Sequence, residues 1–312
     1  MATRWRQERA ANGPQAPGGC PPDPDVADKR DFYERMPSLP IPLDRGRIAK
    51  RWLPEGCRLL DIGCGAGYHV RHLARKAAKV IAIDVDPVAL PIARRRVRSS
   101  RTTFLRYDGD RLPFADASFD AVSMLDVLEH VQDREALVAE IARVLRPGGI
   151  WIVSVPYRGP VRWLSPENMA RDFPRLFALL SRLAPVQFWV RGHNATDTRH
   201  EHFDCHELKS VAGPSFRAER VARRGSLLYG LAYLGLCFPL PRLQQLWASA
   251  CFALMALDYQ IPYGPLAYNL IMQFRRQVPA VGSEPRFEAP DFGQDDLLPL
   301  SAGESWPLQH AA

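Results

Sequence analysis

Three glycines stand at positions 63, 65 and 67, directly after a short apolar run that ends at Ile62. Side chains at these positions would keep a ligand away from the main chain, so the spacing indicates a tight turn that offers bare backbone to a small molecule. A helix expected from Tyr68 would aim unpaired N–H groups and the positive end of its dipole at that molecule. A tight loop without a ligand is the simpler alternative.

Acidic side chains accompany three neighbouring apolar runs. Asp61 precedes the glycines, Asp84 ends the run at 80–84, and Asp108 follows the run at 102–107. Ligands of open parallel sheets bind at the carboxyl ends of strands, which is where all three acids fall. There Asp61 suits an ammonium group, Asp84 suits two ribose hydroxyls, and Asp108 suits an adenine amine.

S-adenosylmethionine has all three of these groups, and the sequence predicts that it is the cofactor, bound by residues 45–160. A dinucleotide fingerprint would need the spacing G-x-G-x-x-G to hold a pyrophosphate. This chain has G-x-G-x-G with an acid beside it. The spacing therefore disfavours an NAD-dependent enzyme.

The elements that must position these residues alternate along the chain. We expect strands over 58–62, 80–84, 102–107, 119–126 and 150–155, and helices over 43–53, 68–78, 87–98 and 134–145. This alternation predicts parallel β-α units in an α/β, doubly wound, Rossmann-like fold. Further on, Asp204 and Glu207 form a capping-box pair that opens a helix, and residues 216–223 and 266–274 have strand character. The prediction is thus a mostly parallel, seven-stranded sheet.

Residues 59–67, 80–87, 104–120 and 121–155 resemble the motifs of class I methyltransferases, especially the family that includes ubiquinone and menaquinone biosynthetic enzymes. The resemblance covers about a third of the chain. It gives no information about the residues after Pro156, because the family shares a cofactor and a fold but not an acceptor. The motifs that carry it are Leu112-Pro113-Phe114, Ser118-Phe119-Asp120, Leu128-Glu129-His130-Val131 and Arg143-Val144-Leu145-Arg146-Pro147-Gly148-Gly149.

This resemblance implies a role for each cofactor residue. The ribose would be bound by Asp84, and the adenine by Asp108 and Gly109. Leu125 and Asp126 would line the cofactor face at the end of the fourth strand. The methionine part would be contacted by Asp61, Gly63, Gly65 and Gly67. The resemblance also implies that the last two strands pair as an antiparallel hairpin.

Methyl transfer to oxygen generally needs a base, and histidine suits that task near neutral pH. His130 follows the fourth strand at the carboxyl edge, so it is the catalytic candidate; a capping or packing role in the turn is the alternative. A divalent ion at Glu129 and His130 is conceivable for a phenol acceptor, but the sequence does not establish it. A second group, His200 and His202, is expected to line the acceptor pocket. A surface loop and a metal site are the alternatives, and we predict no metal.

An apolar insertion at 226–262 precedes the last strand. From 226 to 257 it holds one charged residue, Arg242, in 32 positions, and Pro239 and Pro241 split it into segments too short to span a membrane. Three interpretations stay open: a lid on the core, a membrane-surface or re-entrant element, and a dimer interface. The second segment carries an apolar stripe at helical spacing, made of Leu243, Leu246, Trp247, Ala250, Cys251 and Leu254.

Composition sets the remaining expectations. The net charge of +7 is uneven, since residues 157–277 carry 15 basic against 8 acidic side chains. Such a surface suggests an anionic partner. Six scattered cysteines fit a reducing, cytoplasm-like compartment, with a position at the inner face of a membrane as a further option. We expect one methyltransferase domain over 28–277, disordered segments over 1–27 and 278–312, and no signal peptide.

The predicted reaction is methyl transfer to a small-molecule or lipid-linked acceptor, at oxygen. Two rivals stay open. The first is an RNA methyltransferase, which the basic half motivates, although no appended RNA-binding module is recognisable. The second is a binding protein with the same fold and no turnover, which the intact Asp61, Asp84 and Asp108 disfavour.

Overall fold

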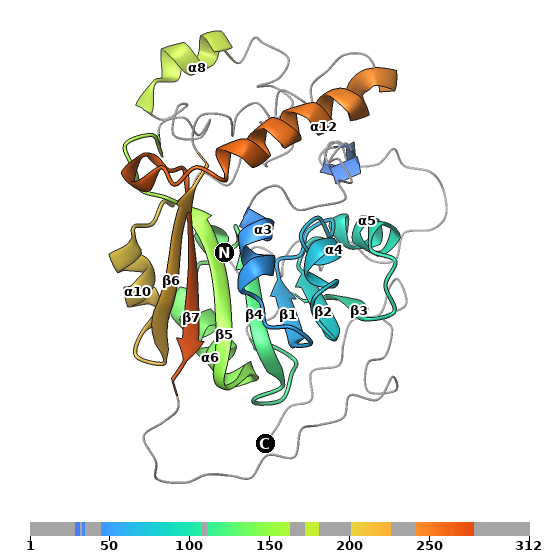
Figure 1. Cartoon of the computed structure of the whole chain (residues 1–312), viewed down its shortest axis with the longest axis vertical. Helices are drawn as coiled ribbons and strands as arrows, with labels where there is room; N and C mark the ends of the chain where they lie inside the picture. Colours follow the sequence, from blue (N-terminus) through green and yellow to red (C-terminus); the bar gives the residue numbers. More distant parts are fainter. Residues whose placement is uncertain are drawn as a thin grey trace, which may run out of the picture.

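A seven-stranded sheet organises the computed structural model, which describes residues 29–31, 33–34, 45–107, 111–162, 172–180, 201–225 and 241–277. The strand order is β3-β2-β1-β4-β5-β7-β6, and β7 is antiparallel to both of its neighbours while the other pairs are parallel (Figure 1). The strands are β1 (Arg58–Ile62), β2 (Lys79–Asp84), β3 (Thr102–Arg106), β4 (Phe119–Leu125), β5 (Leu145–Pro156), β6 (Phe216–Arg224) and β7 (Asn269–Arg276). The predicted fold class is confirmed.

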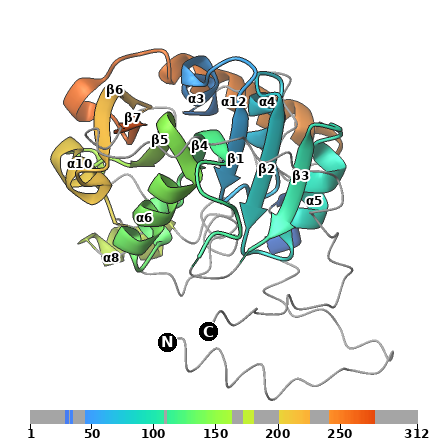
Figure 2. The same cartoon turned by 90° about the horizontal axis from the view of Figure 1, so that it is seen from below.

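Helices cover both faces of this sheet, as the view from below shows (Figure 2). One apolar cluster packs α3 (Arg45–Trp52), α4 (Val70–Leu73) and α5 (Ala89–Arg96) against the sheet. The other packs α6 (Arg134–Val144) and α10 (Cys205–Ala212) on the opposite face. The central strands are therefore buried on both sides, which is why they are apolar runs without alternation.

Most predicted elements are confirmed, and their differences lie at the ends. The helix expected over 68–78 is only α4, because the amides of Lys76 and Ala77 both return to the carbonyl of Leu73 in a tightened turn. β5 begins at Leu145, five residues earlier than predicted, with a register irregularity against β4 between Phe119 and Ala121. α5 is also shorter than expected, starting at Ala89, and α3 ends at Trp52, one residue early, while residues 43–44 lie outside the described residues.

The region after β5 supplies one covering helix, the last two strands and the elements that connect them. α10 begins with the predicted capping box, in which Asp204 accepts from the main chain and Glu207 from the amide of Asp204. The last two strands form the implied antiparallel hairpin. The short helix α8 (Pro174–Leu180), the long helix α12 (Pro241–Asp258) and the turn η3 (Gly264–Leu266) complete this set.

α12 lies at the carboxyl edge of the sheet, since its chain continues into the start of β7, which pairs with the end of β5 (Figure 1). Three residues of the predicted apolar stripe point outward: Leu246 is 70% exposed, and Trp247 and Leu254 are each 45% exposed. Among the described residues, none of the helices combines the length and the hydropathy needed to cross a bilayer. Residues 226–240 and the segments 1–27 and 278–312, on which further predictions fall, lie outside the described residues.

Candidate active site

The glycine loop runs from the end of β1 to α4. The amides of Gly63 and Cys64 donate to the carbonyl of Ile83, at 2.8 and 3.0 Å, which ties the loop to the end of β2. Gly63 has φ +72°, and a Cβ there would stand 2.2 Å from Val127 Cγ2. Gly65 has φ +50°, and a Cβ there would meet no heavy atom within 4 Å. Gly63 is thus required by packing, whereas Gly65 borders open space in which a ligand could lie.

Asp61 lies behind this loop and is 3% exposed. Its Oδ1 accepts a hydrogen bond from the hydroxyl of Ser123 on β4. Burial raises the pKa of Asp61 to about 7; the Ser123 bond opposes this rise, and the nearby Asp84 adds to it. A buried carboxyl with a raised pKa gains most from a cationic neighbour, so an ammonium group fits this position.

Asp84 ends β2 beside the loop. Its Oδ2 accepts from the amide of Gly65 at 2.6 Å, and its Oδ1 accepts from the amide of Asp86 at 2.8 Å. Burial raises the pKa of Asp84 in spite of these bonds. Each oxygen keeps a second lone pair, so the carboxylate could also accept bonds from two ribose hydroxyls.

An N-terminal segment, residues 29–31 and 33–34, closes this side of the site. The hydroxyl of Tyr33 donates to Asp86 Oδ2 at 3.1 Å, and burial together with Asp86 and Asp84 raises the pKa of Tyr33. Arg95 pairs with Glu34, and Arg96 donates to the carbonyl of Tyr33. Sequence reasoning missed Tyr33, because a contact across 53 residues has no local pattern.

The opposite wall is the end of β4. Leu125 is 7% exposed. Asp126 has φ +56°, a left-handed conformation that is uncommon for a residue other than glycine and is often found at functional sites. Its Oδ2 pairs with Arg45 of α3, and its Oδ1 accepts from the hydroxyl of Ser154 at 2.7 Å. The carboxylate that was predicted to face the cofactor is therefore also held by protein partners.

Arg45 also extends this network to the end of α12. It donates from NH1 to the hydroxyl of Tyr259 at 3.4 Å, and Asn269 Nδ2 donates to the same hydroxyl at 2.6 Å. Tyr259 is 4% exposed and fills the space against Gly225. Tyr259, which directly follows α12, is thus connected through Arg45 to the wall of the cofactor site.

The turn η1 (Leu128–His130) follows β4 and sends its two polar side chains in different directions. His130 is exposed. Glu129 is 2% exposed, and neither of its carboxylate oxygens has a hydrogen-bond partner within the described part of the chain. Burial and the neighbouring Asp126 raise the pKa of Glu129 well above its ordinary value. Of the two, Glu129 is the group whose environment is perturbed in the way that functional carboxyls often are.

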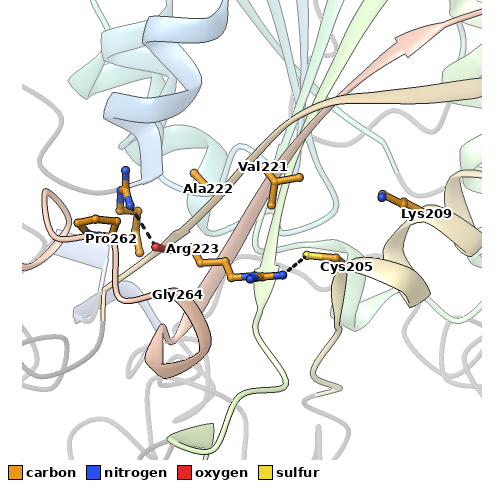
Figure 3. A pocket seen from close by; sticks show the side chains of 8 residues that line it. Cys205, Lys209, Val221, Ala222, Arg223, Pro262 and Gly264 are labelled. Atoms are coloured by element: carbon orange, nitrogen blue, oxygen red, sulfur yellow. Dashed lines mark hydrogen bonds between the residues drawn. The ribbon is translucent and has the colours of Figure 1, made fainter.

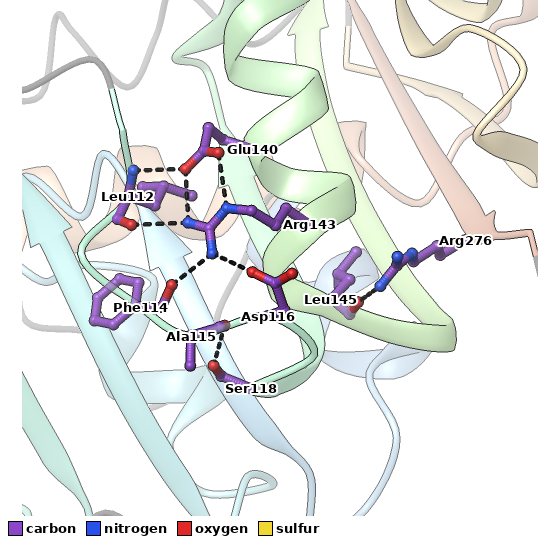
Figure 4. Close-up of polar contacts among 9 residues, drawn as sticks. All are labelled: Leu112, Phe114, Ala115, Asp116, Ser118, Glu140, Arg143, Leu145 and Arg276. Atoms are coloured by element: carbon purple, nitrogen blue, oxygen red, sulfur yellow. Dashed lines mark hydrogen bonds and ion pairs between the residues drawn. The ribbon is translucent and has the colours of Figure 1, made fainter. Parts of the chain in front are cut away.

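The loop that holds Leu112 and Phe114 is anchored by one arginine of α6, from the family motif at residues 143–149 (Figure 4). Arg143 of α6 donates to the carbonyls of Leu112 and Phe114 at 2.9 and 2.7 Å, and pairs with Asp116 at 2.8 Å. Glu140 completes the group by accepting from Arg143 at 2.7 Å and from the amide of Leu112 at 2.8 Å. The two motifs therefore act together to fix the loop that follows β3.

Three predicted residues, Asp108, Gly109 and His200, lie outside the described residues. β3 nevertheless ends beside β2, since the amide of Tyr107 donates to the carbonyl of Asp84 at 3.1 Å. His202 is 6% exposed and its ring lies 6.3 Å from that of Tyr268, next to the end of β5. In the described segments, no three histidine, cysteine or acidic side chains are grouped so that they could hold a metal ion.

Comparison with known proteins agrees with this geometry. Residues 60–153 match the model of a methyltransferase domain family. A demethylmenaquinone methyltransferase of Tropheryma whipplei is 37% identical over 129 residues, which are 40% of this chain and 54% of that protein. A ubiquinone biosynthesis O-methyltransferase of Xanthomonas oryzae is 36% identical over 143 residues, 44% of this chain and 59% of the relative. The chain spans about half the length of the curated relatives it matches.

Among solved structures, a chain of the Haloferax volcanii complex between the Trm112 methyltransferase activator and a methyltransferase superposes with a TM-score of 0.51 at 18% identity. The match covers 83% of this chain and all of the other, and it shows a shared fold. The family match falls on the segment that holds the glycine loop, Asp61 and Asp84. Residues 60–153 therefore match a methyltransferase domain, and the fold and the site geometry of this segment fit S-adenosylmethionine as the cofactor.

Proposed function

We propose that this protein transfers the methyl group of S-adenosylmethionine to a small-molecule or lipid-linked acceptor, at an oxygen atom. One observation carries the proposal: Gly65, Asp61 and Asp84 meet at one edge of the sheet, where bare backbone borders open space. The raised pKa of Asp61 suits the ammonium group of the cofactor, and the free lone pairs of Asp84 suit the ribose. By resemblance, Asp108 and Gly109 would hold the adenine.

When bound, the cofactor would supply a methyl carbon on a sulfonium. The acceptor oxygen would bond to that carbon in line with the carbon–sulfur bond, which breaks and leaves its electron pair on a neutral thioether sulfur. The protein then has two tasks, namely to hold the acceptor in line and to take the proton that a hydroxyl acceptor loses. His130 is the base that the sequence predicts, and its exposure lets an acceptor reach it from solvent. Glu129 is the second candidate, because its buried carboxyl has no described partner and a raised pKa.

The acceptor class rests on two observations. The relatives named above are, by name, enzymes of menaquinone and ubiquinone synthesis, and the exposed apolar side chains of α12 lie at the same sheet edge as the glycine loop. Large apolar patches of this kind often mark contacts with membranes or partners. We therefore propose a cytoplasmic protein that lies against the inner face of a membrane, with His202 and His200 on the acceptor side.

The test is incubation of the purified protein with methyl-labelled cofactor and an extract of its own cells, followed by separation into lipid, RNA, protein and small-molecule fractions. Label in the lipid or small-molecule fraction is expected. Label confined to RNA would overturn the acceptor class. Calorimetry that detects no cofactor binding would instead favour the binding protein without turnover.

Matched variants identify the base. Glu129→Gln and His130→Gln remove the two candidates, while Glu135→Gln and His206→Gln make the same chemical changes at exposed sites of α6 and α10. A base typically contributes a factor of about 100 to 10,000 in turnover. We expect such a loss for one member of the first pair, with unchanged cofactor affinity. Full activity in both Glu129→Gln and His130→Gln would remove the base from the mechanism.

A further inference from the structure

A second cavity lies away from the glycine loop, between α10, β6 and the loop that follows α12 (Figure 3). Its volume is about 570 Å³ and it opens to solvent. It does not include any residue of the cofactor site described above. The residues that line it are Cys205, Lys209, Val221, Ala222, Arg223, Arg224, Pro262 and Gly264.

Three cations line this cavity, and none of its lining residues is acidic. Within the described part of the chain, Lys209, Arg223 and Arg224 make no ion pair with a carboxylate within 4 Å. The same strand carries an acidic side chain, Glu219, but it pairs with Arg275 at 2.6 Å and not with a cation of the cavity. Lys209 and Arg223 lie on the α10 face of the sheet, while Arg224, the next residue of the strand, points to the other face. The two cations on the α10 face are uncompensated, which favours an anionic ligand.

Arg223 is held in a fixed position inside the cavity. Its Nη2 atom donates to Cys205 Sγ at 3.0 Å (Figure 3). Its guanidinium also lies over the ring of Tyr157, 5.2 Å from the ring centroid. Its Nε atom is buried and has no hydrogen-bond partner among the residues that the structure describes. A buried donor without an acceptor is costly, and a guanidinium fork matches two oxygens of a phosphate group.

The rim of the cavity is apolar. Val221, which lines it, is 46% exposed, and the loop that contributes Pro262 and Gly264 also carries Ile261 at 48% exposure and Leu266 at 52%. Exposed apolar side chains around a basic centre match a phosphate that carries an apolar group, as in a phospholipid.

We propose that this cavity is a phosphate-binding site formed by Arg223 and Lys209, with Arg224 as a further cation at the edge of the strand. The proposal goes beyond methyl transfer, because it assigns a ligand group to a part of the molecule outside the cofactor site. Two sources share this chemistry: the headgroup of an anionic lipid, which the apolar rim favours, and a soluble phosphate ester. Binding can be measured without cofactor, so failure of this proposal and failure of the proposed reaction are distinguishable.

Three variants of the full-length chain test the site. Arg223→Gln removes the fixed guanidinium, and the double variant Lys209→Gln/Arg224→Gln removes the other two charges while keeping the Arg223 contacts. Arg220→Gln is the matched control, because Arg220 is an exposed arginine of the same strand that does not line the cavity. Circular dichroism and thermal melting of each variant establish that it is folded.

The first arm measures co-sedimentation with vesicles of phosphatidylcholine alone and of phosphatidylcholine with phosphatidic acid. We expect stronger binding to the acidic vesicles, weakened about tenfold by Arg223→Gln and by the double variant and unchanged by Arg220→Gln. The second arm follows glycerol phosphate and inorganic phosphate by phosphorus NMR line broadening. Broadening that Arg223→Gln abolishes, without vesicle binding, would support the site and assign it to a soluble ester.

Two outcomes would overturn the proposal. One is an equal loss of vesicle binding in Arg220→Gln and in the cavity variants, which would show diffuse attraction by the basic surface and no site. The other is wild-type protein that neither prefers acidic vesicles nor broadens either phosphate signal.

Discussion

Replacing Gly65 by alanine tests the position of the cofactor more directly than any loss of charge does. A Cβ on Gly65 would enter open space, although the amide of the same residue donates to the carboxylate of Asp84. The backbone there has φ +50°, so an alanine costs about 1 to 2 kcal/mol of folding stability through left-handed strain alone. If the methionine part of the cofactor lies against this backbone, the methyl group also occupies ligand space, and affinity falls by more than about tenfold.

Gly56→Ala supplies the matched control. Gly56 has φ +66°, and a Cβ there would likewise meet nothing within 4 Å, but it lies in the turn before β1 and not in the glycine loop. Both variants should lose similar stability in urea unfolding, and only Gly65→Ala should lose cofactor affinity in calorimetric titration. Equal affinities in the two variants would refute the reasoning, because the space beside Gly65 would then not be where the ligand lies.

Three further predictions follow from the same site. The pKa of Asp61 in the folded protein is about 7 against an ordinary 3.8, so cofactor affinity should fall as pH drops below about 7. For the same reason, the free energy of unfolding of the cofactor-free protein should fall as pH rises from 3.8 to about 7. Titrations and unfolding curves of wild type and Asp61→Asn would check both, and an unchanged pH profile in the variant would contradict the assignment. Arg143→Met removes the donor to two loop carbonyls and leaves Glu140 with only the amide of Leu112, so urea unfolding should show a loss of about 3 kcal/mol with weaker cofactor binding. A loss near zero would show that the loop is held by its buried side chains. Tyr259→Phe leaves the side-chain amide of Asn269 without its acceptor, so the free energy of unfolding should fall by about 1 to 3 kcal/mol. Cofactor titration would show whether the connection reaches the site.

The parts of the fold that could be predicted are those fixed by local patterns. The capping box of Asp204 and Glu207 lies within four residues and needs no tertiary context. The buried strands can be recognised in the sequence because parallel strands that are covered on both faces must be apolar. Helix ends were less predictable, as the short α4 shows, because the closing turn after Leu73 depends on how the main chain tightens.

The sequence predicts which residues of the candidate site lie near the strand ends. It does not predict the directions in which their side chains point. Sequence order places Glu129 and His130 together after β4, but a 3₁₀ turn rotates successive side chains by about 120°. In the structure this rotation buries Glu129 and exposes His130. The contact of Tyr33 with Asp86 joins residues far apart in the chain, so nothing in the local sequence could reveal it.

The two halves of the chain differ in how much their sequences tell, yet they share one sheet and one core, because β7 pairs with β5 along its length and α10 packs beside α6. The motifs end at Pro156, and the elements after it would form the acceptor side under the proposed function. Arg45 pairs with Asp126 at the end of β4 and also donates to Tyr259 after α12. A shift of α12, for instance on a membrane or an acceptor, would therefore act on the wall of the cofactor site through this arginine. A divergent acceptor region can therefore be attached to a core whose motifs stay recognisable: β7 and α10 hold that region to the sheet, whereas the exposed side of α12 can vary with the acceptor.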